Sequence, residues 1–396
     1  MTTNHGAIEQ LGARTRRARV PTVVTFMVTD RCNYECVHCY QEHDQADGEL
    51  PFDEVRRILG EVADAGTLFL VLMGGEFFMR RDADDILRAA HELGFAIRLK
   101  TTGHHVTDKR ADLIASLRPI EVDLSLYAAS RHVHEGVTRQ PGSWERTVEA
   151  AKRLTARGVP VVLRNPVMQS NAGEVEGVTM LATELGCQRS FDPKIMGRQD
   201  TDLEPVSLRM DAAALRGFYD GQGPDLARQW AGYDAATGTV RGREMRPVDD
   251  APCGAGTSGV AITSDGQVWP CTSLAMPVGD LRRQSFREVW SGGPDLDGLR
   301  GLRWAHISEC NRCAVRAFCS RCHGSALHEH GDLQGPSLEA CRHAVAVRDE
   351  LRARGVVPAD HTALPPTWDR VDADGQHQRR APSDGKRRPA ALRIIE

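Results

Sequence analysis

The sequence has no long apolar run and no strong excess of charge of one sign. Its 54 acidic and 50 basic side chains leave a formal net charge of −4, which argues against a protein built mainly to hold nucleic acid or a membrane surface. No apolar stretch approaches the roughly 18 residues that a membrane-spanning helix needs. The first residues also lack the apolar core of a secretory signal. We therefore expect a cytoplasmic protein with no nucleic-acid and no membrane partner.

Eleven cysteines stand out in a chain of otherwise ordinary composition. Ten of them fall in two groups, and Cys187 stands apart. A reducing cytosol disfavours structural disulfides, so clustered cysteines there indicate metal binding. The first group is Cys32, Cys36 and Cys39, and the second is Cys253, Cys271, Cys310, Cys313, Cys319, Cys322 and Cys341.

From Pro21 the chain alternates apolar β-branched runs with helix-length amphipathic segments. The expected strands are Thr22–Val28, Leu68–Met73, Ala96–Leu99, Ile120–Leu126, Val159–Leu163 and a weaker Phe191–Met196. The expected helices are Phe52–Ala65, Asp82–Leu93, Thr107–Leu117, Trp144–Arg157 and Gly173–Leu185, with Thr107 and Ser143 as N-caps. Such repetition predicts a parallel sheet covered by helices. Six units rather than eight indicate a partial (β/α)6 TIM barrel, in which the chemistry lies at the C-terminal ends of the strands.

The length of 396 residues indicates two or three domains. The alternation stops near residue 200, and a polar, Gly-rich stretch with one expected helix at Ala212–Tyr219 follows. The cysteine-dense part beyond it predicts a small α+β domain that metal must staple. The expected organisation of this α/β protein is a flexible lead-in (1–20), the partial barrel (21–200), a bridging segment (201–250), the cysteine-rich domain (251–345), and a C-terminal helix end with a disordered basic tail (346–396).

Cys32, Cys36 and Cys39 form a C-x3-C-x2-C array directly after the first expected strand. Three thiolates on one loop can hold three irons of a [4Fe–4S] cube and leave the fourth iron open to a small-molecule ligand. The alternative is a zinc site, for which His38 or His43 would supply a fourth ligand. The spacing favours the iron–sulfur cluster and leaves zinc open.

A second motif, Met73-Gly74-Gly75-Glu76, ends the second expected strand. Together with the cysteine array, it resembles the radical S-adenosylmethionine (SAM) superfamily. The resemblance implies that the three cysteines ligate a [4Fe–4S] cluster whose open iron is chelated by the amino and carboxylate groups of SAM. It further implies that the two glycines let the backbone approach the methionine part of SAM and that Glu76 accepts from its ammonium. His38, at the aromatic position of the family pattern, joins this expected cofactor-binding set.

Further SAM contacts follow from the same resemblance. The family's turn after strand three reads Thr101-Thr102-Gly103 here, without the usual asparagine. Ser125, in the fourth expected strand, matches a serine that meets the SAM carboxylate or ribose, and Arg164, after the fifth, matches a basic position. The alternative for both is a polar strand end without a binding role.

The second cysteine group resembles the SPASM extension, whose pattern is C-x9–15-G-x4-C, then C-x2-C-x5-C-x3-C, then a last cysteine. The match spans residues 253–341 and departs from the pattern between Cys319 and Cys322, where two residues intervene. The resemblance implies two auxiliary [4Fe–4S] clusters. Their expected ligands are Cys253, Cys271 and Cys322 for the first, which leaves it one ligand short, and Cys310, Cys313, Cys319 and Cys341 for the second. A pair of zinc knuckles is the alternative.

The resemblance implies an enzyme that takes an electron from a reductase such as flavodoxin or ferredoxin, cleaves SAM to a 5′-deoxyadenosyl radical and abstracts hydrogen from its substrate. SPASM enzymes typically act on peptides, so we expect an oxidised or cross-linked residue in a ribosomally made precursor peptide. Thr272 stands where sulfatase-maturing relatives carry aspartate, which argues against that activity. An N-terminal leader-binding domain of about 80 residues has no room before the first strand, so a separate protein or another surface would bind any leader.

Two alternatives stay open. A radical SAM enzyme could instead act on a small molecule such as a tetrapyrrole precursor, by decarboxylating its side chains. A protein without enzymatic activity could use the cysteines as a zinc- or Fe–S-stapled binding module and recruit a partner through its basic tail. The basic residues of that tail are Arg379, Arg380, Lys386, Arg387 and Arg388.

Overall fold

The computed structural model describes residues 14–41, 48–237, 239–240 and 243–371. Most of the expected lead-in and the basic part of the expected tail lie outside these residues. The chain forms two compact units, each built from segments that are separated in sequence. The first unit comprises Met1–Asn165, Glu176–Asp192 and Gly254–Arg300, and the second comprises Pro166–Val175, Pro193–Cys253 and Gly301–Glu396.

A nine-stranded sheet forms the centre of the first unit, in the order β12-β11-β10-β1-β2-β3-β4-β5-β6. Its strands are β1 (Val23–Met27), β2 (Phe69–Met73), β3 (Ala96–Thr101), β4 (Glu121–Ser125), β5 (Val161–Pro166), β6 (Gln188–Asp192), β10 (Gly259–Ile262), β11 (Gln267–Trp269) and β12 (Gly279–Asp280). The neighbours from β10 through β1 to β5 pair in parallel, whereas β11 is antiparallel to both β10 and β12. The partial barrel is confirmed. The pairing of β10 with β1 was not predicted, because these strands are far apart in sequence.

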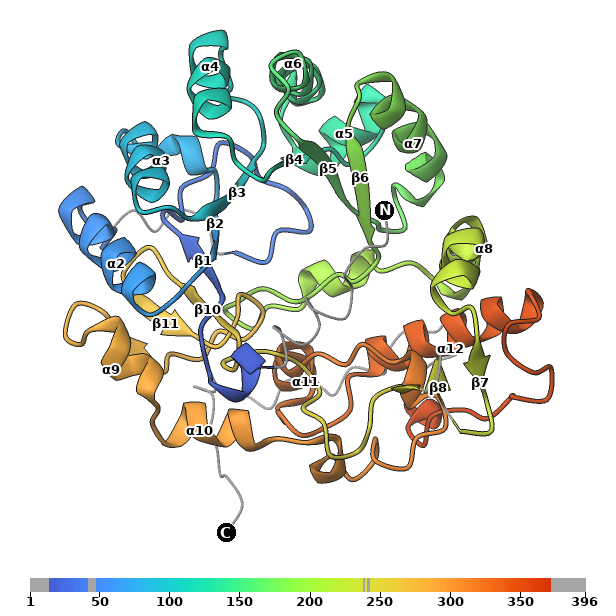
Figure 1. Ribbon diagram of the computed structural model, residues 1–396. Helices are drawn as coiled ribbons and strands as arrows, with labels where there is room; N and C mark the ends of the chain where they lie inside the picture. Colours follow the sequence, from blue (N-terminus) through green and yellow to red (C-terminus); the bar gives the residue numbers. More distant parts are fainter. Residues whose placement is uncertain (1–13, 42–47, 238, 241–242, 372–396) are drawn as a thin grey trace. The chain divides into compact units, whose positions relative to one another are not determined.

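Helices cover one face of this sheet, as the ribbon shows for α2, α3, α4 and α6 (Figure 1). The helices of the unit are α2 (Phe52–Asp64), α3 (Ala83–Glu92), α4 (Asp108–Leu117), α5 (Arg131–Thr138), α6 (Ser143–Thr155), α7 (Val175–Glu184), α9 (Phe286–Ser291) and α10 (Pro294–Gly301). The sequence predicted α2, α3, α4, α6 and α7 to within two residues at each end. It did not predict α5, whose sequence RHVHEGVT is rich in residues of modest helix propensity.

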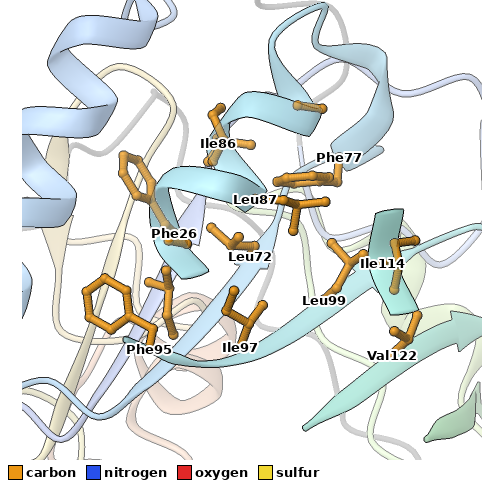
Figure 2. Packing of buried hydrophobic residues seen from close by; sticks show 14 of the residues in the cluster. Phe26, Leu72, Phe77, Ile86, Leu87, Phe95, Ile97, Leu99, Ile114 and Val122 are labelled. Carbon is orange, nitrogen blue, oxygen red and sulfur yellow. The ribbon is translucent and has the colours of Figure 1, made fainter. Parts of the chain in front are cut away.

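The core of the first unit lies between the sheet and the helices. Alternate residues of each strand face the helices, and Phe26, Leu72 and Leu99 are at most 1% exposed. Figure 2 shows these side chains meeting Ile86 of α3 and Ile114 of α4. Each such burial stabilises the fold by roughly 1.5–3 kcal/mol. The other face of the sheet is therefore left for the functional groups.

One of the two predicted helix caps is present. The Thr107 side chain accepts a hydrogen bond from the backbone N–H of Arg110 at the start of α4. The predicted cap at Ser143 is wrong, because Gly142, with φ of 75°, is the N-cap and Ser143 is the first residue of α6. The hydroxyl of Ser143 instead lies 2.7 Å from that of Thr138, which ties α6 to the end of α5.

The second unit is organised around α12 (Leu338–Ala353), which packs against α8 (Ala212–Gln229). It also contains α11 (His323–His330) and a small antiparallel sheet of β7 (Tyr233–Asp234), β8 (Thr239–Val240) and β9 (Arg243–Glu244). Helix α8 is longer than predicted, because it continues through Pro224. Cysteines belong to the core of this unit: Cys310 and Cys319 pack with apolar side chains that include Trp304, Phe318 and Ala344.

Candidate functional site

The first cysteine group lies on the loop that follows β1, and the end of α5 holds this loop in place. The backbone N–H of Glu35 donates to the carbonyl of Thr138 at 3.2 Å, and that of Val37 donates to the carbonyl of Val137 at 3.0 Å. These carbonyls are free to accept because the last turn of a helix leaves its C=O groups without partners in the helix. Helix α5, which the sequence did not predict, therefore positions the loop.

The thiols of Cys32, Cys36 and Cys39 lie close enough together to act on one another electrostatically. Burial raises the pKa of Cys32 to about 12, with smaller contributions from Glu76 and Cys39. Burial also raises the pKa of Cys36, and the neighbouring Cys39 and Cys32 raise it further. Thiolates without metal are therefore disfavoured here, and binding of a metal cluster would release protons. The structure thus brings together the three predicted ligands.

Gly74 and Gly75 pack directly against the start of the cysteine loop. A Cβ atom on Gly74 would lie 2.4 Å from the carbonyl oxygen of Thr29, and one on Gly75 would lie 2.5 Å from that of Arg31. The backbone N–H of Gly75 donates to the Thr29 carbonyl at 2.8 Å. Glycine is therefore required at both positions by the cysteine loop itself. The predicted approach of SAM is a second reason for glycine at these two positions, and it stays a prediction.

Glu76 is completely buried, and its carboxylate joins the end of β2 to the end of β3. One carboxylate oxygen, Oε1, accepts from the Thr101 hydroxyl at 2.6 Å and from the Phe78 N–H at 3.1 Å. The other, Oε2, accepts from the Thr102 N–H at 2.6 Å. A carboxylate has about four acceptor positions, so these three bonds leave capacity for one further donor on Oε2. The predicted bond from the SAM ammonium is compatible with this arrangement.

Ser125 and Arg164 are direct neighbours across β4 and β5, on the sheet face opposite the core. The guanidinium of Arg164 contacts two carboxylates of β4: Nη2 lies 2.5 Å from Oε1 of Glu121, and Nε lies 3.0 Å from Oδ1 of Asp123. The structure therefore brings the two predicted SAM contacts together. It also shows that Arg164 has structural partners, which the sequence alone did not indicate.

These ion pairs continue across the inner face of the barrel. Arg98 and Lys100 of β3 pair with Glu121 and Asp123 of β4 at 3.0 and 3.7 Å. Asp123 is only 2% exposed, and burial raises its pKa to about 6. The hydrogen bond with Glu121 also raises this pKa, whereas Lys100 and Arg164 lower it. Burial by itself raises the pKa of Glu121. The hydrogen bond with Asp123 and the guanidinium of Arg98 outweigh this effect, so the pKa is lowered. Sequence reasoning missed this network, although the alternating charges of β3 and β4 were readable.

Tyr127 adjoins the sulfur of Cys36, and two histidine rings contact Tyr127. Tyr127, just after the end of β4, has its hydroxyl 3.9 Å from Cys36 Sγ. The ring of His38 meets that of Tyr127 edge-on, with 4.7 Å between centroids, and the ring of His134 stacks on that of Tyr127 at 5.4 Å. Burial lowers the pKa of His38 to about 4. Tyr127 and His134 were not among the predicted site residues, although Tyr127 follows Ser125 by two positions.

The second cysteine group lies partly in the second unit. There the thiol of Cys319 interacts with those of Cys341, Cys310 and Cys313. Together these four cysteines are the ligands predicted for one auxiliary cluster. Burial raises the pKa of Cys310 to about 11 and that of Cys341 to about 12. The hydroxyl of Thr367 lies 3.5 Å from Cys341 Sγ. The structure thus gathers this predicted set in an apolar core.

Cys253, Cys271 and Cys322 are divided between the two units. Within the second unit, Cys253 and Cys322 both interact with the guanidinium of Arg321, whose pKa burial lowers. That guanidinium is 4% exposed and donates through Nε to the carbonyl of Gly335 at 3.0 Å. Cys271 belongs to the first unit, so the assignment of these three cysteines to one cluster stays a prediction.

The donor chemistry of both cysteine sets fits iron–sulfur clusters, because each set presents several partly or fully buried thiols that lose their protons on metal binding. Across the described part of the chain, no group of three or more His, Cys, Asp or Glu side chains is positioned to hold a metal ion. No helix in the same residues is long and apolar enough to cross a membrane.

Comparison with known families agrees with this site. The family model of the radical SAM superfamily matches residues 26–179, and that of the SPASM iron–sulfur cluster-binding domain matches residues 253–314. The chain therefore contains a radical SAM domain and a SPASM domain, and it is similar to peptide maturases. Its cofactors are SAM, the [4Fe–4S] cluster that binds SAM, and auxiliary iron–sulfur clusters.

Individual relatives are distant but extensive matches. The chain is 27% identical over 330 residues to the AdoMet-dependent heme synthase of Methanosarcina barkeri, covering 79% of this chain and 94% of that one. It is 27% identical over 345 residues to the PqqA peptide cyclase of Ruegeria pomeroyi, covering 80% and 87%. Among solved structures, Streptococcus suis SuiB bound to the precursor peptide SuiA has a TM-score of 0.64 at 17% identity, covering 86% of this chain and 82% of SuiB. This last likeness concerns the fold.

Proposed function

We propose that the protein uses SAM-derived radical chemistry to oxidise or cross-link a residue of a ribosomally synthesised precursor peptide. The observation that carries the proposal is the grouping of Cys32, Cys36 and Cys39 on a loop after β1, in one chain with a second, largely buried set of four cysteines. When bound, the first cluster and SAM supply a 5′-deoxyadenosyl radical that abstracts hydrogen from an unactivated C–H bond.

In this proposal the chain's residues position the cofactors. Cys32, Cys36 and Cys39 hold the cluster, while Gly74, Gly75 and Glu76 line the approach to the methionine part of SAM. Ser125 and Arg164 stand on the inner face at the strand ends, where such chemistry lies in barrels of this kind. His38, edge-on to Tyr127, closes the cluster side of the site and limits access of water.

A peptide substrate is supported by the relatives. PqqA peptide cyclase is named for a peptide substrate, and SuiB was solved with its precursor peptide. We propose further that the auxiliary clusters accept the electron that the substrate loses, and that flavodoxin or ferredoxin delivers the electron for SAM cleavage. A separate leader-binding protein would present the peptide. A reducing cytoplasm suits a chain with eleven cysteines and is the proposed location.

A second candidate is decarboxylation of a tetrapyrrole precursor. One relative, matched over 94% of its own length, is named a heme synthase, and this supports a small-molecule substrate as the alternative. The inner face of this chain carries Arg98, Lys100 and Arg164, and cations of this kind suit the carboxylates of a tetrapyrrole.

The test begins with protein purified and reconstituted without oxygen. We expect reductive cleavage of SAM to 5′-deoxyadenosine under dithionite, and faster cleavage when the correct substrate is added. Short peptides encoded near the gene and a set of tetrapyrrole precursors are added in separate reactions. Mass spectrometry then follows each candidate for the loss of two hydrogens, which marks peptide oxidation or cross-linking, or for the loss of carbon dioxide.

The outcomes separate the candidates. Loss of two hydrogens from a peptide supports the proposal, and loss of carbon dioxide from a tetrapyrrole replaces it with the second candidate. Zinc in place of iron, together with no cleavage of SAM, would reject both and favour the stapled binding module. The triple variant C32A/C36A/C39A is the negative control for SAM cleavage.

A further inference from the structure

The hydrogen bond between Tyr127 and Cys36 changes direction once the cysteine is a metal ligand. With the thiol protonated, Cys36 Sγ–H donates to the Tyr127 oxygen across 3.9 Å. A cysteine bound to iron is a thiolate and has no proton to donate. The hydrogen bond then reverses, with Tyr127 O–H as donor and the sulfur as acceptor, while the Ser125 side chain, which also hydrogen-bonds Tyr127, donates to the phenol oxygen.

Two histidines hold the Tyr127 ring in this position. His134 of α5 is fully buried and stacks on the ring, with an angle of 19° between the planes. Its Nδ1 accepts the backbone N–H of Tyr127 at 3.1 Å, so the proton of the neutral imidazole is on Nε2. His38 also contacts the ring, edge-on at 76°. These two ring contacts and the backbone hydrogen bond hold Tyr127 with its hydroxyl 3.9 Å from the sulfur.

The same helix holds Tyr127 and the cysteine loop. Helix α5 supplies His134, and its last turn accepts the backbone N–H groups of Glu35 and Val37, which flank Cys36. The hydroxyl and the sulfur are therefore positioned by one rigid element rather than by two independent loops. Tyr34, a buried tyrosine of the cysteine loop, is oriented differently: its hydroxyl lies 3.3 Å from Nδ1 of His104.

We propose that Tyr127 is a positioning residue for the SAM-binding cluster, whose O–H···S hydrogen bond to Cys36 raises the reduction potential of that cluster. The inference rests on the proposed function, because it assumes that Cys36 is a cluster ligand. The physical reason is that an added electron increases the negative charge on the sulfurs, and a hydrogen-bond donor stabilises the more negative state. Loss of the donor makes the cluster harder to reduce.

The decisive experiment compares Y127F with the wild type in the full-length, reconstituted protein. The midpoint potential of the cluster is measured by redox titration with EPR detection, and the signal that changes on addition of SAM identifies this cluster. We expect the ratio of reduced to oxidised cluster in Y127F to fall three- to tenfold at a fixed potential, where tenfold corresponds to a 59 mV shift for one electron. Y34F is the matched control and leaves the ratio unchanged.

A second substitution tests the opposite change, a stronger hydrogen-bond donor, and keeps the hydroxyl group intact. 3,5-Difluorotyrosine placed at position 127 keeps the ring and the O–H group but is the stronger acid and the stronger donor, so the cluster becomes easier to reduce. Unchanged potentials in both Y127F and the fluorinated protein, with iron content equal to the wild type, overturn the inference and leave the proposed function intact. A wild type that holds iron but no SAM-sensitive cluster overturns both.

Discussion

Glu76 accepts the backbone N–H of Thr102 at 2.6 Å, and this one bond joins the glycine turn after β2 to the turn after β3. Both turns are expected to border the SAM site, so the carboxylate has a structural duty in addition to its predicted one. Substitutions at Glu76 therefore affect two functions, its structural role and its predicted binding of SAM. Stability measurements can separate the two.

The first prediction concerns E76Q in the protein without clusters. The amide oxygen can replace Oε1, but its NH2 group must then face the N–H of Thr102, which leaves a buried donor unsatisfied. We expect unfolding free energy to fall by about 1–3 kcal/mol. Urea unfolding measures the change, with E92Q at the exposed end of α3 as control. A stability equal to the wild type would contradict the role derived from the hydrogen bonds.

The second prediction concerns G75A. A Cβ at this position would lie 2.5 Å from the carbonyl oxygen of Arg31, so the turn or the cysteine loop must shift. We expect a loss of stability of about 1–3 kcal/mol and poorer iron loading. The matched control is G136A in α5, where a Cβ meets nothing within 4 Å and where alanine favours a helix. Thermal unfolding and iron analysis compare the two; equal effects would show that the close approach is not required.

The third prediction concerns metal content. The wild type should bind about twelve irons per chain, and C32A/C36A/C39A about eight, if three cubane clusters are present. Cys187 belongs to neither cysteine set, so C187A should keep the full content. Iron and sulfide analysis after anaerobic reconstitution makes the comparison. Retention of about twelve irons by the triple variant would argue that these thiols are not ligands.

The fourth prediction concerns pH and Asp123. Its pKa is raised to about 6 in the folded protein, from 3.8, because the side chain is buried. The folded state therefore holds the proton to higher pH than the unfolded chain. The resulting stabilisation is present below pH 4 and is lost as the pH rises toward 6 and above. The size of this pH-dependent stabilisation is set by the charged side chains of the same network, which are Glu121, Lys100, Arg98 and Arg164.

D123N removes this titration, so the stability of the wild type relative to D123N should decrease by on the order of 1–3 kcal/mol between pH 4.5 and pH 7.5. The control is D112N, which changes an exposed carboxylate on α4 paired with Arg157. Urea unfolding at several pH values gives the difference. A constant difference between wild type and D123N across this range would show that Asp123 is ionised throughout.

Much of the barrel was predictable because its signals are local. The strands from β1 to β5 and the helices between them have strong periodicity, and their bounds follow from the sequence within a few residues. The sixth strand was placed too late, since β6 has a weak, half-exposed pattern. Helix α5 was missed for a related reason, because its residues favour helix only modestly and contacts with the cysteine loop hold it.

By itself the sequence determined which chemistry is available: the thiol spacing, the glycine pair and the strand–helix alternation are properties of neighbouring residues. Only the tertiary structure decided which distant groups meet. It placed Tyr127 against Cys36, set Asp123 between Lys100 and Arg164, and added β10 to the edge of β1. Such contacts depend on how the whole sheet and its helices pack, and no pattern of adjacent residues contains that information.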